Sequence, residues 1–200
     1  VHDLCHTAER YLPSLIKNLV NENSAPKSEN RFDFLMTINN TENISKTLKL
    51  PVAILRQSSI NGYYNNSTNS LNTEINIPSF RIGKTSLDSV KLHLDNANES
   101  INLQLTASQN HKGSTHNYLH LKSNARDDKI NTTLHWTNDK NDKFEAEISA
   151  SALFIEEDEN NKKLLTEITI PSTQIIRKDS PWNVDPAPVT ISGNYIYIDN

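Results

Sequence analysis

The sequence predicts a mainly β protein, an antiparallel meander of amphipathic strands preceded by one short helical segment. Three observations lead to this prediction. From residue 31 onward, apolar side chains recur at every second position, the period of a strand with one buried face. Clusters of Asn, Asp, Ser and Gly separate these stretches, as expected of turns between antiparallel neighbours. Only residues 3–20 show the three- and four-residue spacing of a helix.

The helical stretch comes first in the chain. Pro13 interrupts it, so we expect a kink or two short helices. The polar stretch 21–30 contains Pro26 and is typical of a linker. We therefore divide the chain into a helical segment with its linker at 1–30 and a sheet domain at 31–200. The apolar stripe of the helical stretch consists of Leu4, Ala8, Tyr11, Leu12, Leu15, Ile16 and Leu19.

The first expected strands are interrupted by one short helix. Alternation over 31–38 predicts a strand. Thr41 is a plausible cap for a helical turn over 42–48, which Pro51 ends. Further strands are expected at 60–64 and 71–77.

A regular series of one-faced strands follows, joined by polar turns. The expected strands are 90–94, 101–105, 119–121, 130–136, 144–154 and 164–170, with turns at 96–98, 110–114, 126–128, 138–142 and 156–161. The tail predicts a hairpin of 189–191 and 196–198 around Ser192-Gly193-Asn194.

Composition excludes several classes of function. The 20 basic and 24 acidic residues leave a formal charge of −4, whereas a nucleic-acid binder needs a basic surface to neutralise phosphates. Four glycines and the single Cys5 argue against phosphate-cradling loops, an internal disulfide and a thiolate metal cage. No apolar run is long enough to span a bilayer. Because the chain starts at Val1 without a signal-like segment, we expect an internal piece of a longer protein.

One-faced strands raise the question of what keeps their apolar side from water. Burying each aliphatic side chain is worth about 1.5–3 kcal/mol, so a wet apolar side is costly. The expected helices are too short to cover so many strands. Three covers remain, namely a second sheet, closure into a barrel, or an apolar partner that is not protein.

The residues of that side favour the last of these covers. They are mostly medium-sized aliphatic side chains, with few Phe or Trp to fill a wide interior. They include almost no charged or amide groups, which a pocket for a polar ligand uses to orient it. Such a surface suits alkyl chains, whose affinity comes from contact area. The candidate lining residues are Leu92, Leu94, Leu103, Leu105, Leu119, Leu121, Leu134, Ile148 and Ile168.

Four motifs add a family resemblance. They are Thr41-Glu42-Asn43-Ile44-Ser45 through Leu50-Pro51, Ile60-Asn61-Gly62, Ile77-Pro78-Ser79, and Ser180-Pro181-Trp182-Asn183-Val184-Asp185-Pro186 followed by a short hairpin. Together they resemble the Bacteroidetes-type branch of the TamB family, which belongs with the AsmA-like envelope proteins of Gram-negative bacteria. The resemblance spans most of residues 31–200, and the Trp-Asn-Val-Asp-Pro stretch is its most specific part.

The resemblance implies a sheet curled into an open, taco-like groove or partial barrel with a hydrophobic inner surface. It implies a periplasmic protein with an inner-membrane anchor that passively moves phospholipid toward the outer membrane. It also implies support for outer-membrane protein assembly with an outer-membrane barrel partner of the TamA kind. The family provides no catalytic residue, cofactor or metal to carry over, so we expect no enzyme. We assign neither membrane insertion nor docking of the barrel partner to these 200 residues.

Three groups of polar residues allow other chemistry. His2 and His6 lie one helical turn apart beside the Cys5 thiol and could hold zinc, although a solvated helix start is the simpler interpretation. The histidines at positions 93, 120 and 135 point to the polar side of their strands. They would form a pH-sensitive or metal-binding patch if the strands were neighbours, whereas scattered surface histidines are the simpler interpretation. The acidic run 156–159 lacks the glycine of a calcium loop and is typical of a solvated turn.

Aromatic residues carry the last two predictions. Trp182 lies between two X-Pro bonds, which favour extended or turn geometry, and we interpret it as a turn anchor. The rival function is an extracellular β-sandwich or barrel that acts as an adhesin or glycan-binding module. In it, Tyr63, Tyr64, Tyr195 and Tyr197 would stack on sugar rings.

Overall fold

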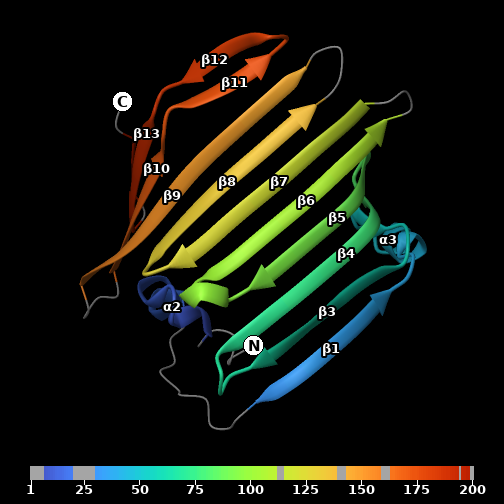
Figure 1. The fold of residues 1–200 in the computed structure, drawn as a ribbon, viewed down its shortest axis with the longest axis horizontal. Coiled ribbons are helices and arrows are strands. Elements are labelled where there is room, and N and C mark those ends of the chain that lie inside the picture. Colours follow the sequence, from blue (N-terminus) through green and yellow to red (C-terminus); the bar gives the residue numbers. More distant parts are fainter. Residues whose placement is uncertain are drawn as a thin grey trace.

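The computed structural model describes residues 7–19, 30–111, 115–138, 143–158, 163–193 and 195–198. Within these ranges the chain forms one antiparallel sheet of 14 strands (Figure 1). The sheet is open, because its ordered path runs from β1 at one edge to β14 at the other without closing. Figure 1 shows β1 and β3 to β9 side by side in one broad layer, with β10 and β13 turned nearly edge-on beside β9. The prediction of a mainly β antiparallel meander is therefore confirmed.

The strands are longer and more numerous than the alternation alone indicated. They are β1 (Arg31–Ile38), β2 (Val52–Ile54), β3 (Ser58–Asn65), β4 (Ser70–Ile82), β5 (Thr85–Asp95), β6 (Ile101–His111), β7 (Thr115–Arg126), β8 (Lys129–Asn138), β9 (Phe144–Asp158), β10 (Lys163–Ile170), β11 (Thr173–Arg177), β12 (Ser180–Val184), β13 (Ala187–Ser192) and β14 (Tyr195–Ile198).

From β3 to β10 the strand order follows the sequence, and two strand groups are placed outside this simple meander. The 13-residue β4 exceeds the 8-residue β3, and β2 pairs with the part of β4 that β3 leaves free. The 15-residue β9 likewise exceeds the 8-residue β10, and β11 pairs with its first residues while β12 pairs with β11. The unequal strand lengths thus place β2 and the β11–β12 hairpin in the sheet.

The N-terminal stripe forms two short helical stretches, as Pro13 predicted. Residues 7–9 are helical, and α2 (Pro13–Leu19) begins at the proline, whose missing N–H costs nothing at a first helical position. The backbone N–H and the hydroxyl of Ser14 both donate to the Asp128 carboxylate over 2.8 Å. An acid from the β7–β8 turn therefore caps α2. Residues 1–6 and 20–29, with the possible His2, Cys5 and His6 site and most of the linker, lie outside the described residues.

The second helix, α3 (Glu42–Thr47), matches the expected turn, but Thr41 does not cap it through its side chain. The Asn40 side-chain oxygen instead accepts the Glu42 N–H over 2.8 Å. The Thr41 hydroxyl accepts the Ile54 N–H over 2.9 Å and so ties β2 to the helix start. The residue before the expected cap therefore supplies the capping oxygen.

Two turn predictions need correction. Trp182 lies inside β12 rather than in a turn, because the X-Pro bonds hold the segment extended on the sheet edge, and its side chain is exposed. Lys178 and Asp179, both at positive φ, form the nearby turn. Of the expected turn at 156–161, residues 156–158 lie in β9 instead, and residues 159–161 lie outside the described residues. The tail hairpin is present, with Gly193 at φ 58°.

The core lies at one end of the sheet, where the N-terminal helices meet it. Tyr11 and Leu12 are buried against Ala125, with Leu15, Ile16, Ile101, Ile130 and Phe154 packed around them. The Tyr11 hydroxyl accepts hydrogen bonds from the side-chain amides of Asn69 and Asn96. The helices therefore close the end of the sheet that carries the β3–β4, β5–β6 and β7–β8 turns.

Candidate functional site

One face of the sheet consists of apolar residues that the strand registers align in rows. The central row crosses eight strands from β1 to β9, because each of its residues is paired directly with the next. Rows two residues away along the strands point to the same side. We call this side the apolar face. The central row consists of Met36, Ile60, Ile75, Leu92, Leu105, Leu121, Leu134 and Ile148.

Three further rows widen the apolar face, and none of their residues carries a charge. The first contains Leu94, Leu103, Ser123, Thr132 and Ala150; the second contains Ile101, Ala125, Ile130, Ala152, Ile168, Val189 and Ile198; the third contains Ala107, Leu119, Trp136, Ala146, Ile175 and Trp182.

All nine residues proposed from the sequence lie on the apolar face. Leu92, Leu105, Leu121, Leu134 and Ile148 fall in the central row, and Leu94, Leu103, Leu119 and Ile168 fall in the three flanking rows. The alternation that selected them reports the face on which a residue lies, so their co-location follows from the strand period.

The rows also contain residues that were not among the nine candidates. Met36, Ile60 and Ile75 extend the central row, while Trp136 and Trp182 belong to one flanking row. Ile60 and Ile75 belonged to expected strands, and their period-two spacing was a usable signal. The place of Trp182 depends on its pairing with Ile175, which alternation within a single strand does not reveal.

The centre of the apolar face is partly accessible. All nine proposed residues are half-buried, and the exposed fractions of Met36 and Trp136 are 55% and 42%. Among the described residues, the helical segment packs on this face at one end, and the core that it forms there contains no residue of the central row. The central row is therefore not sealed by the described part of the chain.

The few polar groups on the apolar face satisfy one another or lie at its edge. The hydroxyls of Ser123 and Thr132 are hydrogen-bonded to each other over 3.0 Å. Toward the β6–β7 turn, the Asn117 amide donates to the Gln109 side-chain oxygen over 2.7 Å. The Asn117 oxygen is buried without a hydrogen-bond partner among the described residues. These amides mark a polar end of the face.

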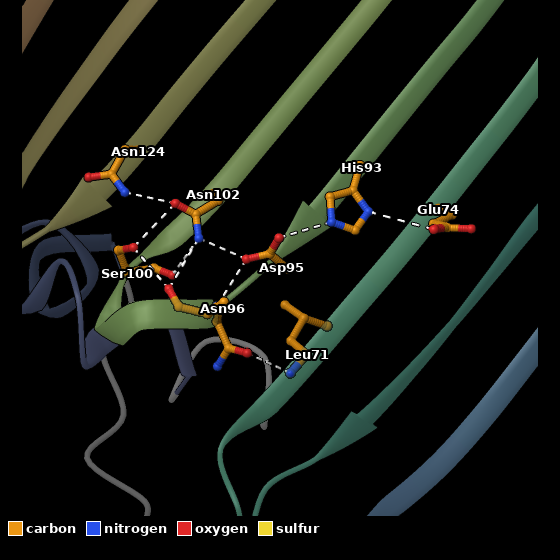
Figure 2. A network of polar contacts seen from close by, with 9 residues as sticks. Leu71, Glu74, His93, Asp95, Asn96, Ser100, Asn102 and Asn124 are labelled. Carbon is orange, nitrogen blue, oxygen red and sulfur yellow. Dashed lines mark hydrogen bonds and ion pairs between the residues drawn. The ribbon is translucent and has the colours of Figure 1, made fainter.

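The opposite face is polar, and part of it forms a connected hydrogen-bond network (Figure 2). Asp95 accepts from the Ala97 N–H over 2.9 Å and from the Asn102 amide over 2.7 Å. Asn124 in turn donates to Asn102 over 2.8 Å. The His93 ring contacts Asp95 through Nε2 over 2.9 Å. The network therefore links β5, β6 and β7.

The environment of Asp95 lowers the pKa of its carboxyl group. Partial burial acts in the opposite direction and raises the pKa, but the hydrogen bonds from Ala97, Asn102 and His93 together outweigh it. The carboxylate is thus the preferred form in the folded network.

The three strand histidines do not form one cluster. His120 on β7 and His135 on β8 are directly opposite each other. His93 on β5 is instead paired with Glu74 and Gln104, in a different row. The described residues contain no group of three or more His, Cys, Asp or Glu side chains arranged to hold a metal ion.

The four tyrosines proposed for the glycan-binding alternative do not gather into one surface on which sugar rings could stack. Tyr64 is 1% exposed, packs against Phe32 and shares a hydrogen bond with Thr7, so its ring is not available. Tyr63 is exposed on β3, whereas Tyr195 and Tyr197 stack on β14 at the other edge of the sheet. Burial and strand order thus separate residues that composition had grouped.

The comparisons with known proteins leave the family open. No family model matches the chain, and no curated protein or solved structure is significantly similar to it. Among the described helices, none is both long enough and apolar enough to cross a membrane.

Proposed function

We propose that the apolar face carries the acyl chains of phospholipids passively. The chain is a periplasmic segment of a TamB-like envelope protein that supports lipid movement between the two membranes of a Gram-negative cell. In the whole protein, an inner-membrane anchor and an outer-membrane barrel of the TamA kind complete the path and assist outer-membrane protein assembly. The observation that carries the proposal is the uncharged central row, which crosses eight strands and stays partly exposed.

The size and chemistry of the face support this function. Eight strands at about 4.8 Å spacing give the central row a width of about 34 Å. Because the face has no charges in its rows, contact area rather than hydrogen bonding would hold an acyl chain there. Repeated weak contacts let a chain slide, while the lipid head group remains in water.

The experiment introduces one charge into the face. Leu103→Arg places a guanidinium group between Leu94 and Ser123, where burial of a charge beside acyl chains is costly. Gln104→Arg is the matched control, because Gln104 is the next residue in β6, is exposed and points to the polar face. Purified wild type and both variants are extracted, and bound phospholipid is quantified by mass spectrometry.

We expect phospholipid with the wild type and Gln104→Arg, and at least a tenfold loss with Leu103→Arg at unchanged circular dichroism. Phospholipid bound equally by all three proteins would contradict the proposal, as would its absence from the wild type. Unfolding of Leu103→Arg alone would place Leu103 in a closed core and would also contradict it.

One observation favours the glycan-binding rival. The polar face has a hollow of about 480 Å³ whose lining includes Asn102, Gln104, Lys122 and Asn124. Amide and charged groups of this kind orient polar ligands. Binding of the purified protein to a glycan array, together with no bound phospholipid, would favour this second function.

A further inference from the structure

The strand register places two histidines opposite each other on the polar face. His120 and His135 are direct cross-strand partners on β7 and β8. Side chains at such positions have Cβ atoms about 4.5–5.5 Å apart and point to the same side. Both histidines are half-buried, and so they retain contact with solvent. From this separation, one ring nitrogen of each can reach a single ion at metal–nitrogen distances of about 2.0–2.1 Å.

We propose that His120 and His135 form a two-histidine site for a divalent transition-metal ion, with water in the remaining positions. Imidazole nitrogens suit Zn²⁺, Ni²⁺ and Cu²⁺, and Cu²⁺ binds such ligands most tightly among them. The site uses two protein ligands, one from each of two neighbouring strands. It lies on the face opposite the proposed acyl-chain surface and does not depend on that function.

The surroundings of His135 favour this role. Its direct partner on β9 is Glu147, whose carboxylate oxygen lies 4.0 Å from His135 Nδ1. The Nδ1 side of the His135 ring thus faces a carboxylate, which leaves Nε2 for the metal. Glu145, two residues earlier on β9, points to the same face and adds a second negative charge. Lys122, two residues after His120, is the nearest positive charge on its own strand.

His93 provides a natural contrast on the same face. Its Nε2 lies 2.9 Å from an Asp95 oxygen, and its Nδ1 lies 3.9 Å from a Glu74 oxygen (Figure 2). A hydrogen bond to the Asp95 carboxylate thus occupies Nε2 of His93, and the residues paired with His93 in β4 and β6 are not histidines. His93 therefore should not contribute to metal binding, which makes His93→Gln the matched control.

The test uses the protein without a histidine tag and with His2→Gln and His6→Gln in every sample, so that N-terminal histidines do not compete. Zn²⁺ is titrated calorimetrically into this background protein and into its His120→Gln, His135→Gln and His93→Gln variants. Substoichiometric Cu²⁺ is added to the background protein, and broadening of the imidazole signals is followed by nuclear magnetic resonance.

We expect one Zn²⁺ site whose affinity falls at least tenfold in His120→Gln and in His135→Gln and is unchanged in His93→Gln. Cu²⁺ should broaden the ring signals of His120 and His135 before that of His93. If a variant fails to fold, the broadening pattern in the background protein decides alone. Equal broadening of all three histidines, or affinity unaffected by either substitution, would overturn the proposal.

Discussion

Asp95 shows how one side chain organises the polar face. It accepts hydrogen bonds from a backbone amide, from Asn102 and from His93, and these bonds lower its pKa despite partial burial. A group whose folded-state pKa is lowered contributes stability above its ordinary pKa. That contribution is lost as the pH falls through the folded-state pKa, when the carboxylate takes up a proton.

We therefore predict that Asp95→Ala lowers the free energy of unfolding by about 1–2 kcal/mol near pH 7, because it leaves several donors without their charged acceptor. The difference from the wild type should shrink as the pH falls below about 4. Urea denaturation at a series of pH values measures both effects, with Asp33→Ala as an exposed control on β1. A constant difference from pH 7 to pH 3 would contradict this account.

Gly62 illustrates a second constraint at the residue scale. A Cβ atom at this position would overlap the Asn72 carbonyl oxygen and the Phe34 ring, which lies against the glycine from the neighbouring strand. We predict that Gly62→Ala lowers the free energy of unfolding by about 1–3 kcal/mol, the usual cost of overpacking. Thermal or urea denaturation checks this, with Ser59→Ala in the same strand as control. A fully stable Gly62→Ala variant would show that β1 and β4 can move apart.

At the scale of elements, the N-terminal helices pack on one end of the sheet and are hydrogen-bonded to one of its turns. Leu12 and Tyr11 pack on Ala125 of β7, and Asp128 of the β7–β8 turn holds both Ser14 and the Tyr11 carbonyl. Since few side chains in the described residues are fully buried, this small core has a large share in holding the helices to the sheet.

Leu12→Ala should therefore release the helical segment. We predict a loss of about 2–3 kcal/mol in the free energy of unfolding, as for other buried leucines, with faster hydrogen exchange at residues 14–17. Lys17→Ala, an exposed position on α2, is the control and should change the free energy by less than about 0.5 kcal/mol. If exchange in α2 stays slow in Leu12→Ala, another contact holds the helix.

Much of the sheet could be predicted from sequence, because the side on which each residue lies depends only on the strand period. All nine proposed lining residues share one face for this reason. Register depends instead on turns and irregularities, such as the shift between β5 and β6 near Ser89, which has positive φ. Sequence reasoning therefore could not pair His120 with His135 or separate them from His93.

The missed elements have a similar explanation. β2, β11 and β12 each have five residues or fewer. β2 pairs with the part of β4 that β3 leaves free, and β11 pairs with the part of β9 that β10 leaves free. Strands this short carry little alternation of their own. The buried Tyr64 was likewise misplaced among candidate sugar contacts, because its burial comes from Phe32 and Thr7, which are distant in sequence.

At the scale of the whole molecule, the two faces of one sheet separate two kinds of chemistry. The apolar face has uncharged rows that reach across the sheet, while the polar face holds the Asp95 network and the two opposed histidines. The sheet is open, and the central row of the apolar face stays partly accessible. The central claim is that the apolar face accepts acyl chains.

Trp136 provides the most direct test, because it lies on the apolar face with 42% of its surface exposed. Trp182→Phe leaves Trp136 as the single tryptophan, and its fluorescence is measured with phospholipid that carries bromine on the acyl chains. The control moves the indole to the polar face through Trp136→Phe, Trp182→Phe and His135→Trp. We predict strong quenching of Trp136 and little quenching of the control, whereas equal quenching in both or none at Trp136 would contradict the account.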